Sequence, residues 1–193
     1  MVADLPVDIS PGQETLLQQY QHWLAAEALP AGALGPGETD RLHERHLIDS
    51  LLFLHGWDRD SHPESVWDLG SGAGLPGIPL AIALSDTAVT LVDRSGRRAD
   101  LARRAVHILD LGNVEVVQSD VNRLEGEVSM LVSRATLKPE NATELVRRHL
   151  AVEGVAVLGG SWVAPPEIPR GWERKEITLD PLDRIVWLLI MRR

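Results

Sequence analysis

The stretch Val66-Trp-Asp-Leu-Gly-Ser-Gly-Ala-Gly-Leu-Pro-Gly-Ile-Pro79 decides how the rest of the chain is interpreted. It opens as an apolar run typical of a strand and continues with glycines at positions 70, 72 and 74. Glycines at a turn from strand to helix remove Cβ atoms, so a ligand can lie against bare backbone and meet unpaired N–H groups. The stretch therefore predicts a site for a nucleotide-like cofactor.

Two cofactor classes fit these glycines. Gly72-x-Gly74-x-x-Gly77 matches the dinucleotide fingerprint, whereas Asp68-x-Gly70-x-Gly72-x-Gly74 is similar to the first motif of S-adenosylmethionine (SAM) methyltransferases. The glycines alone do not decide between them, because both cofactors carry a nucleoside that packs against the same kind of turn.

The composition is that of one globular domain. The chain has 193 residues, of which 44% are hydrophobic and 24% charged, and it has no cysteine. Disulfides and thiolate metal sites are thereby excluded, and we expect no metal. No uncharged apolar run reaches the ~20 residues that span a bilayer, and the start Met1-Val-Ala-Asp-Leu-Pro6 lacks a secretory pattern. We expect a cytoplasmic protein that does not bind a membrane.

The net charge of −9 argues against binding nucleic acid through the overall electrostatic field. A local basic surface is still allowed. Five arginines lie in or beside the predicted helix 95–110: Arg94, Arg97, Arg98, Arg103 and Arg104. They form either a rim for RNA, together with Arg41 and Arg45, or an ordinary solvated helix face.

The order of predicted elements favours SAM. Helical spacing over 14–29 and 39–54 predicts an N-terminal helical cap within residues 1–60. The main domain, 61–193, alternates strands with helices, which specifies parallel strands joined by crossovers. Its predicted strands are 66–69, 88–92, 114–118, 129–133 and 154–158, and its predicted helices are 77–84, 95–110 and 139–150.

The last two predicted strands, 173–179 and 185–191, are separated by a span too short for a crossover. An antiparallel hairpin is the simplest arrangement for them. A mostly parallel sheet that ends in such a hairpin is typical of class I methyltransferases, whereas dinucleotide domains usually continue with another crossover. We therefore predict an α/β, Rossmann-like, class I SAM-methyltransferase fold, with the cap and the main domain forming one compact unit.

Two acids end the first two predicted strands, at the sheet edge where open α/β sheets bind ligands. Asp68 is placed to reach the amine of the methionine part or to pin the glycine loop, and alternatively to cap a helix. Asp93 is placed to accept both hydroxyls of a ribose, and alternatively to cap the helix that follows it.

Two further segments complete the predicted site. After the third strand, Asp120 or Asn122 can bond an adenine amine, and the backbone of Val121 can meet the ring. Arg134, after the fourth strand, is expected over the cleft, against the SAM carboxylate or the target nucleotide; its alternative is a surface ion pair.

Three segments together resemble the small-subunit ribosomal RNA guanine-N7 methyltransferase (RsmG/GidB) family: Arg45-His-Leu-Ile-Asp-Ser50, Asp68–Pro79 and Ser133-Arg-Ala135. The resemblance implies SAM bound by Gly70, Leu75, Val121, Asn122 and Arg134, with ribosomal RNA or the small ribosomal subunit as partner. The full set of candidate cofactor residues is Asp68, Gly70, Ser71, Gly72, Gly74, Leu75, Asp93, Arg94, Asp120, Val121, Asn122 and Arg134.

Guanine N7 carries an exposed lone pair, so it can attack a sulfonium methyl group without losing a proton. No general base is required, and the sequence designates no catalytic residue. His46 and Arg134 are the candidate substrate contacts. His46 and Asp49 lie three apart on the second predicted helix and are placed to close over the cofactor; a packing histidine with a local acid partner explains His46 at least as well. The alternatives are a small-molecule methyltransferase, a SAM-binding protein without activity and, less favoured, an NAD-dependent oxidoreductase.

Overall fold

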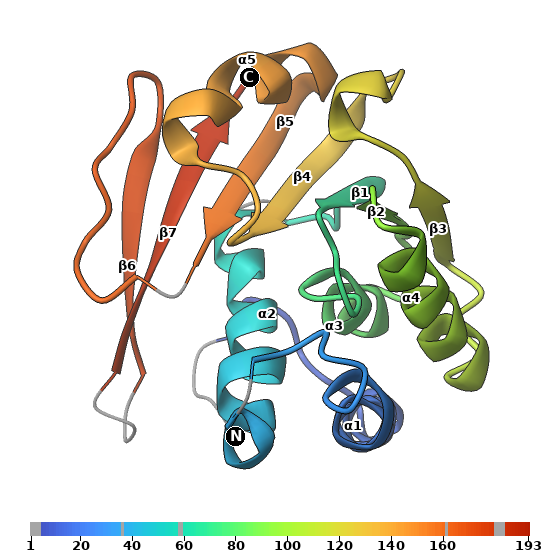
Figure 1. The fold of residues 1–193 in the computed structure, drawn as a ribbon. Helices are drawn as coiled ribbons and strands as arrows, with labels where there is room; N and C mark the ends of the chain where they lie inside the picture. The colour runs from blue at the N-terminus through green and yellow to red at the C-terminus, as the bar shows by residue number, and fades with distance from the viewer. Residues whose placement is uncertain (1–4, 36, 58–59, 161, 180–183) are drawn as a thin grey trace.

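The computed structural model describes residues 5–35, 37–57, 60–160, 162–179 and 184–193. Its described strands form one sheet in the order β3-β2-β1-β4-β5-β7-β6 (Figure 1). Neighbours among β1 to β5 pair in parallel, and β7 pairs antiparallel with both β5 and β6. The bounds are β1 Ser65–Leu69, β2 Ala88–Asp93, β3 Val114–Gln118, β4 Val128–Arg134, β5 Leu150–Gly159, β6 Glu173–Leu179 and β7 Arg184–Arg192.

The central strands are buried on both faces. Along β4, Met130 and Val132 belong to one apolar cluster and Leu131 belongs to another. The same alternation occurs along β5 and β7, because successive side chains of a strand point to opposite faces. These near-continuous apolar runs fit a sheet that helices cover on both sides.

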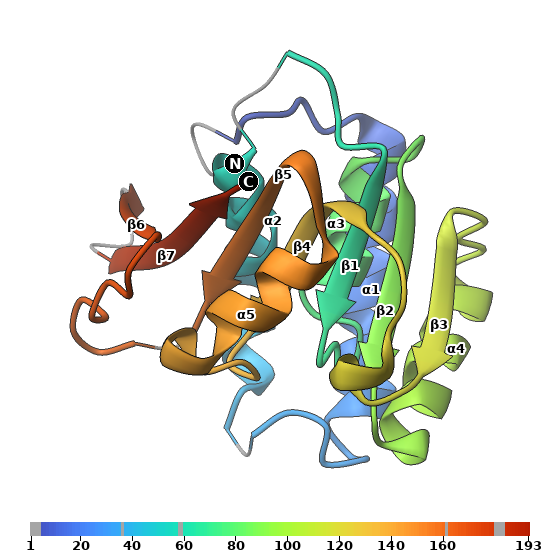
Figure 2. The same cartoon turned by 90° about the horizontal axis from the view of Figure 1, so that it is seen from above.

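The helices divide between the two faces of the sheet. α1 (Pro11–Trp23), α3 (Gly77–Ala83) and α4 (Gly96–Ile108) lie on one face, and α5 (Pro139–His149) lies on the other (Figures 1 and 2). α2, Asp49–Leu51, is the α-helical part of a longer helical segment on the first face. The crossovers thus bring the carboxyl ends of β1, β2 and β4 to a common edge.

The two helices of the predicted cap are present with different bounds. α1 begins at Pro11 behind a capping box made by Ser10 and Gln13, and it continues as a π-helical turn at Leu24–Ala28. The expected helix 39–54 is a succession of segments: 3₁₀ at Thr39–Arg41, π at Leu42–Ile48, α2, and 3₁₀ at Leu52–Gly56. Hydrophobic spacing predicted helical segments here and could not resolve these changes in winding.

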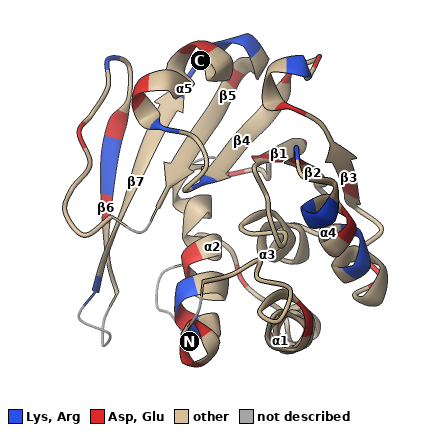
Figure 3. Cartoon of the chain, viewed as in Figure 1, with Lys and Arg blue, Asp and Glu red and all other residues tan. Residues whose placement is uncertain are grey.

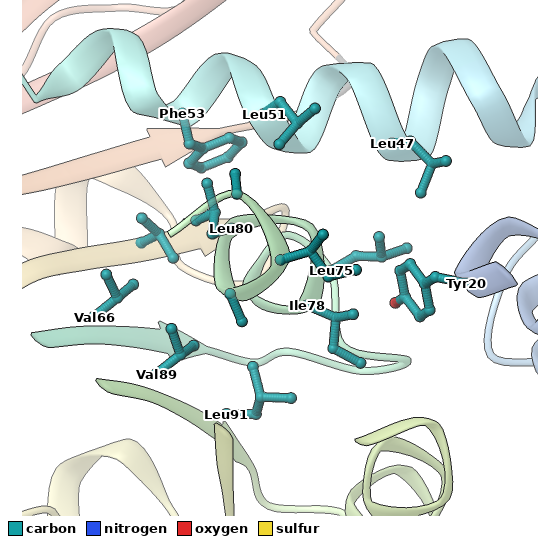
Figure 4. Packing of buried hydrophobic residues seen from close by; sticks show 14 of the residues in the cluster. Tyr20, Leu47, Leu51, Phe53, Val66, Leu75, Ile78, Leu80, Val89 and Leu91 are labelled. Atoms are coloured by element: carbon teal, nitrogen blue, oxygen red, sulfur yellow. The ribbon is translucent and has the colours of Figure 1, made fainter. Parts of the chain in front are cut away.

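α3 is packed between the cap and the sheet (Figure 4). Leu47, Leu51 and Phe53 cover it from one side, while Val66, Val89 and Leu91 lie beneath it. On the α1 side, the buried Tyr20 hydroxyl donates to the carbonyl oxygen of Ala73 at 2.9 Å. α1 is thereby bonded directly to the glycine loop.

The predicted sheet is confirmed, including the closing hairpin, whose connection at 180–183 lies outside the described residues, as do residues 1–4 of the expected cap. The prediction for the fifth strand was too short, since β5 begins at Leu150 instead of residue 154. Glu153 has φ 63°, and the β4–β5 register shifts between Val128 and Met130. Because the backbone is irregular here, the first residues of β5 do not show the regular alternation from which a strand is predicted.

Candidate cofactor and acceptor site

Two cavities, each of about 320 Å³, lie at the carboxyl edge of the sheet. The cap-side cavity lies between the glycine loop, the cap and β7, with Glu38, His46 and Val186 in its wall. The strand-edge cavity lies beyond β2 and β3 and includes Asp93 and Val121. Three residues line both cavities: Gly70, Arg98 and Thr136. The two cavities therefore meet at the glycine loop and can hold two parts of one extended ligand.

The three alternating glycines serve different purposes. A Cβ at Gly70 (φ +79°) would overlap the Thr136 side chain, and one at Gly74 (φ +99°) would lie 2.4 Å from Ile78 Cδ1. A Cβ at Gly72 (φ +59°) would meet nothing within 4 Å, and this residue lines the cap-side cavity. Gly70 and Gly74 thus permit close packing. Gly72 leaves bare backbone facing open space, as a bound cofactor requires.

Asp93 ends β2 and holds the glycine loop. Its Oδ2 accepts from the Gly72 N–H at 3.0 Å, and its Oδ1 accepts from the Ser95 N–H at 2.9 Å. The residue also lines the strand-edge cavity. Each carboxylate oxygen has a second lone pair, so these bonds leave capacity for ribose hydroxyls. The predicted ribose contact stays a prediction, now combined with a loop-binding role.

Asp68 is fully buried beneath the loop and lines neither cavity. Its Oδ2 accepts from the Gly77 N–H at 2.7 Å, whereas its Oδ1 has no hydrogen-bond partner among the described residues. Burial raises the pKa of this carboxyl to about 7. Of the roles considered, the geometry favours pinning the start of α3 over direct contact with a ligand.

Asp120, Val121 and Asn122 all line the strand-edge cavity, as predicted for an adenine site. The backbone N–H and the side-chain amide of Asn122 both donate to Asp120 Oδ1 at 2.9 Å. The backbone bond from Asn122 is the main reason why the pKa of Asp120 is lowered. The two polar side chains form a turn that supports Val121, and their contact with an adenine amine stays a prediction.

Arg134 is the last residue of β4, and its guanidinium forms polar contacts with two residues of the cap. Its Nη1 donates to the carbonyl oxygen of Arg45 at 3.2 Å, and its Nη2 lies 3.2 Å from His46 Nδ1. On the other side of the ring, His46 Nε2 lies 3.1 Å from Glu38 Oε2. Nδ1 must accept from Arg134, so the proton of the neutral ring is on Nε2 and is donated to Glu38.

These contacts exclude one of the two interpretations of Arg134 and show that His46 has an acid partner, Glu38. Burial is the main cause that lowers the pKa of His46, and the Arg134 charge lowers it further. Arg134 is no surface ion pair, since the described residues place no carboxylate within ion-pair distance of it. Both residues line the cap-side cavity. Their predicted substrate contacts are not tested by these distances.

Asp49 does not pair with His46. Arg184 of β7 binds it through two nitrogens, with Nη1 to Oδ2 at 2.8 Å and Nη2 to Oδ1 at 2.6 Å. The bond to Asp49 is the main reason why the pKa of Arg184 is raised. This bidentate pair joins the C-terminal hairpin to the cap, and the hairpin residues Val186 and Leu188 complete the cavity wall.

Figure 3 shows basic residues along α4, and the five arginines in and just before this helix differ in what they contact. Arg97 Nη2 donates to the carbonyl oxygen of Ala31 at 2.6 Å, and Arg104 Nη2 lies 2.8 Å from Glu27 Oε2. Arg103 pairs with Asp100 on its own helix at 2.7 Å. Arg94 lines the strand-edge cavity, and Arg98 lines both. Two of the five arginines, Arg97 and Arg104, therefore contact the cap, which reduces the basic surface that could serve as a rim for RNA.

The described ranges contain neither a cluster of metal-ligating side chains nor a membrane-spanning helix. No three His, Cys, Asp or Glu side chains among them come together in a way that could hold a metal ion. Within the same ranges, no helix combines the length and the apolar character that crossing a membrane needs.

The sheet order, with an antiparallel β7 between β5 and β6, and the cavities at its carboxyl edge define a class I, Rossmann-like methyltransferase. The fold is similar to that of TYW2 from M. jannaschii, solved in complex with AdoMet, with a TM-score of 0.58 and 12% identity. That match covers 77% of this chain and 75% of the other. The same fold was predicted from the order of the elements.

A family model described as rRNA small subunit methyltransferase G (GidB) matches residues 13–163, and the chain belongs to this family. The Mycobacterium marinum ribosomal RNA small subunit methyltransferase G is 38% identical over 158 residues, covering 79% of this chain and 68% of that protein. The Nocardioides sp. protein of the same name is 34% identical over 165 residues, covering 81% and 65%. The chain thus spans about two thirds of the length of these relatives. The predicted family is confirmed.

All the candidate cofactor residues except Asp68 and Gly74 line one of the two cavities. Glu38, Thr136 and the hairpin residues Val186 and Leu188 also line the cavities and were not predicted from the sequence. Arg98 was considered only as part of a possible rim for RNA. Thr136 directly follows the Ser-Arg-Ala segment that carried the resemblance, so its neighbourhood was a usable signal. Glu38 directly precedes the predicted helix 39–54, and neither its type nor its spacing marked it as a site residue.

Proposed function

We propose that this chain transfers the methyl group of SAM to N7 of a guanine in small-subunit ribosomal RNA. The observation that carries the proposal is the pair of cavities that meet at the glycine loop, in a chain that belongs to this methyltransferase family. One cavity has the predicted nucleoside residues, and the other lies between the cap and β4. A ligand bound across both has its ends on opposite sides of Gly70.

The residues present fit SAM. Gly72 turns bare backbone toward the cap-side cavity, where Ser71 is buried with a side-chain oxygen that has no partner among the described residues. Beside the strand-edge cavity, the Asp93 carboxylate has lone pairs left for hydroxyl groups. When bound, SAM supplies an electrophilic methyl group. Asp93, Val121 and Asn122 would hold its nucleoside part, and Ser71, Gly72 and Arg134 would hold its methionine part.

The protein's contribution to this reaction is alignment. N7 needs no deprotonation, so His46 and Arg134 are not required as acids or bases. The hydrogen bonds from Arg134 to Arg45 and His46 hold the cap against β4, which shapes the cavity in which the base would lie. Holding two reactants in line can supply ~7–11 kcal/mol of the barrier.

The test is a mass-spectrometric search for 7-methylguanosine in small-subunit RNA from cells with and without this protein. Purified protein would also be incubated with SAM and either small-subunit particles or naked RNA from the deficient cells. We expect 7-methylguanosine to be absent without the protein and to appear in vitro on one of the two RNA substrates. RNA binding should weaken steeply as salt is added.

Two other outcomes distinguish the alternatives. Binding of S-adenosylhomocysteine without transfer to either RNA substrate would favour a small-molecule methyltransferase or an inactive SAM-binding protein. A thermal shift with NADH and none with S-adenosylhomocysteine would overturn the SAM assignment.

A further inference from the structure

The cap-side cavity has two carboxylates in its wall, Glu38 and Asp49, and the structure separates their tasks. Arg184 binds both oxygens of Asp49. Glu38 Oε2 accepts from His46 Nε2, and Glu38 Oε1 has no hydrogen-bond partner among the described residues. Glu38 therefore lines this cavity with one carboxylate oxygen that no described residue hydrogen-bonds, on a side chain that is only 22% exposed.

A guanine that attacks the methyl group through N7 turns its N7 and O6 edge toward the methyl donor. The opposite edge then carries two parallel donors, N1–H and N2–H, and points away from the cofactor. A carboxylate can accept two such bonds at once, one on each oxygen, and Oε2 has a second lone pair beside its bond to His46. Glu38 has the chemistry to recognise that edge.

The charge of Glu38 also suits the reaction. The N7 lone pair forms the new bond to the methyl carbon, and the electron pair of the broken carbon–sulfur bond stays on sulfur. No proton moves, and the positive charge passes from the sulfonium to the guanine. A fixed carboxylate beside the base stabilises the charge that develops there.

We propose that Glu38 is the specificity-determining residue that binds the N1–H and N2–H edge of the guanine, an inference that rests on the proposed function. His46 is then a positioning residue, because its ring links Glu38 to Arg134. The three residues come from three places in the chain. Glu38 directly precedes the 3₁₀ segment Thr39–Arg41, His46 lies in the π-helical segment Leu42–Ile48, and Arg134 ends β4.

The experiment uses inosine, which keeps N7 and N1–H but lacks the N2 amino group. Small-subunit RNA is transcribed with about one inosine for every ten guanosines, and is used naked and after reconstitution with small-subunit proteins. After methylation, digestion to nucleosides gives the ratio of 7-methylinosine to 7-methylguanosine. For the unmodified protein we expect this ratio to lie about tenfold or more below the input ratio, since one charge-assisted hydrogen bond is lost.

Glu38→Ala should methylate more slowly and bring the product ratio close to the input ratio. Glu38→Gln, which keeps one acceptor oxygen, should give an intermediate ratio and provides the readout if the alanine variant does not fold. Glu44→Ala removes an exposed carboxylate from the same cap, one that lines neither cavity, and should behave like the unmodified protein.

Each result has one meaning. If the unmodified protein methylates guanosine and inosine in the input ratio, the Glu38 proposal is wrong while the proposed function stands. If Glu38→Ala is slow but keeps the low ratio, Glu38 only supports His46, and the proposal is again wrong. If the unmodified protein methylates neither RNA preparation, the proposed function itself fails.

Discussion

The Asp93 carboxylate binds the backbone N–H of Gly72 at 3.0 Å, so the end of β2 fixes the one loop glycine that faces open space. The same carboxylate binds the N–H of Ser95, the N-cap of α4. Loop, strand end and helix start are thus held by a single side chain. Replacing Asp93 should therefore affect both the shape of the glycine loop and the start of α4.

Asp93→Asn should weaken both the fold and cofactor binding. The amide has one acceptor oxygen in place of two, so either Gly72 or Ser95 loses its partner. We expect the free energy of unfolding to fall by about 1–3 kcal/mol and the affinity for S-adenosylhomocysteine to fall about tenfold or more. Chemical denaturation and calorimetric titration measure these changes. Asp100→Asn, which affects an exposed ion pair on α4, should change stability by less than about 1 kcal/mol.

Gly72→Ala and Gly77→Ala should distinguish a glycine that leaves room for the cofactor from a glycine that leaves room for neighbouring side chains. The first places a methyl group in the open cavity and should lower S-adenosylhomocysteine affinity, while its left-handed backbone (φ +59°) costs about 1–2 kcal/mol of stability. The second places a Cβ 2.1 Å from Leu91 Cδ2 and 2.8 Å from Asp68 Oδ2, and should lower the free energy of unfolding by about 1–3 kcal/mol. Equal effects of the two variants on S-adenosylhomocysteine affinity, measured by calorimetric titration, would contradict this division.

Asp68 should give stability a measurable pH dependence. Burial raises its pKa from 3.8 to about 7, so between these values the folded chain holds a proton that the unfolded chain has released. The contribution to stability is therefore full at about pH 4, is lost as pH rises toward 7, and is constant above. Relative to Asp68→Asn, the unmodified protein should lose stability between pH 5 and pH 7 in denaturation experiments. A pH-independent difference would show that the carboxyl titrates normally.

Arg134→Lys should impair the site although it keeps the charge. An ammonium is a point donor and cannot reproduce the planar fork that spans the Arg45 carbonyl and His46 Nδ1. We expect at least a tenfold loss in S-adenosylhomocysteine affinity or in methyl transfer. Arg103→Ala, which removes a surface ion pair on α4, is the matched control and should change neither. Unchanged binding and transfer in Arg134→Lys would remove Arg134 from the site.

Local features of the site could be read from the sequence, and long-range pairings could not. The glycine loop, Asp93 and Val121 lie at the ends of strands or within a few residues after them, so topology alone brings them to one edge. The contact of Arg134 with His46 joins residues 88 positions apart, and that of Arg184 with Asp49 joins residues 135 apart. Spacing carries no information on such side-chain partners. Hence Asp49 was considered beside His46 when its partner is Arg184.

The arginines of α4 show the same limit. From the sequence, their number suggested either a rim for RNA or a solvated helix face. Whether each one meets solvent or the cap depends on where the Leu24–Ala28 turn and Ala31 lie in space. Only the packed structure separates Arg97 and Arg104, which hold the cap, from Arg94 and Arg98, which line the cavities.

The bonds from Arg97 to Ala31 and from Arg104 to Glu27 have a consequence for synthesis on the ribosome. The cap residues precede their partners by 66 and 77 positions, so they leave the exit tunnel well before α4 exists. Leu17, Tyr20 and Trp23, buried in the finished protein, have no sheet to cover them during that interval. The cap is therefore translated well before the elements that it contacts in the folded protein.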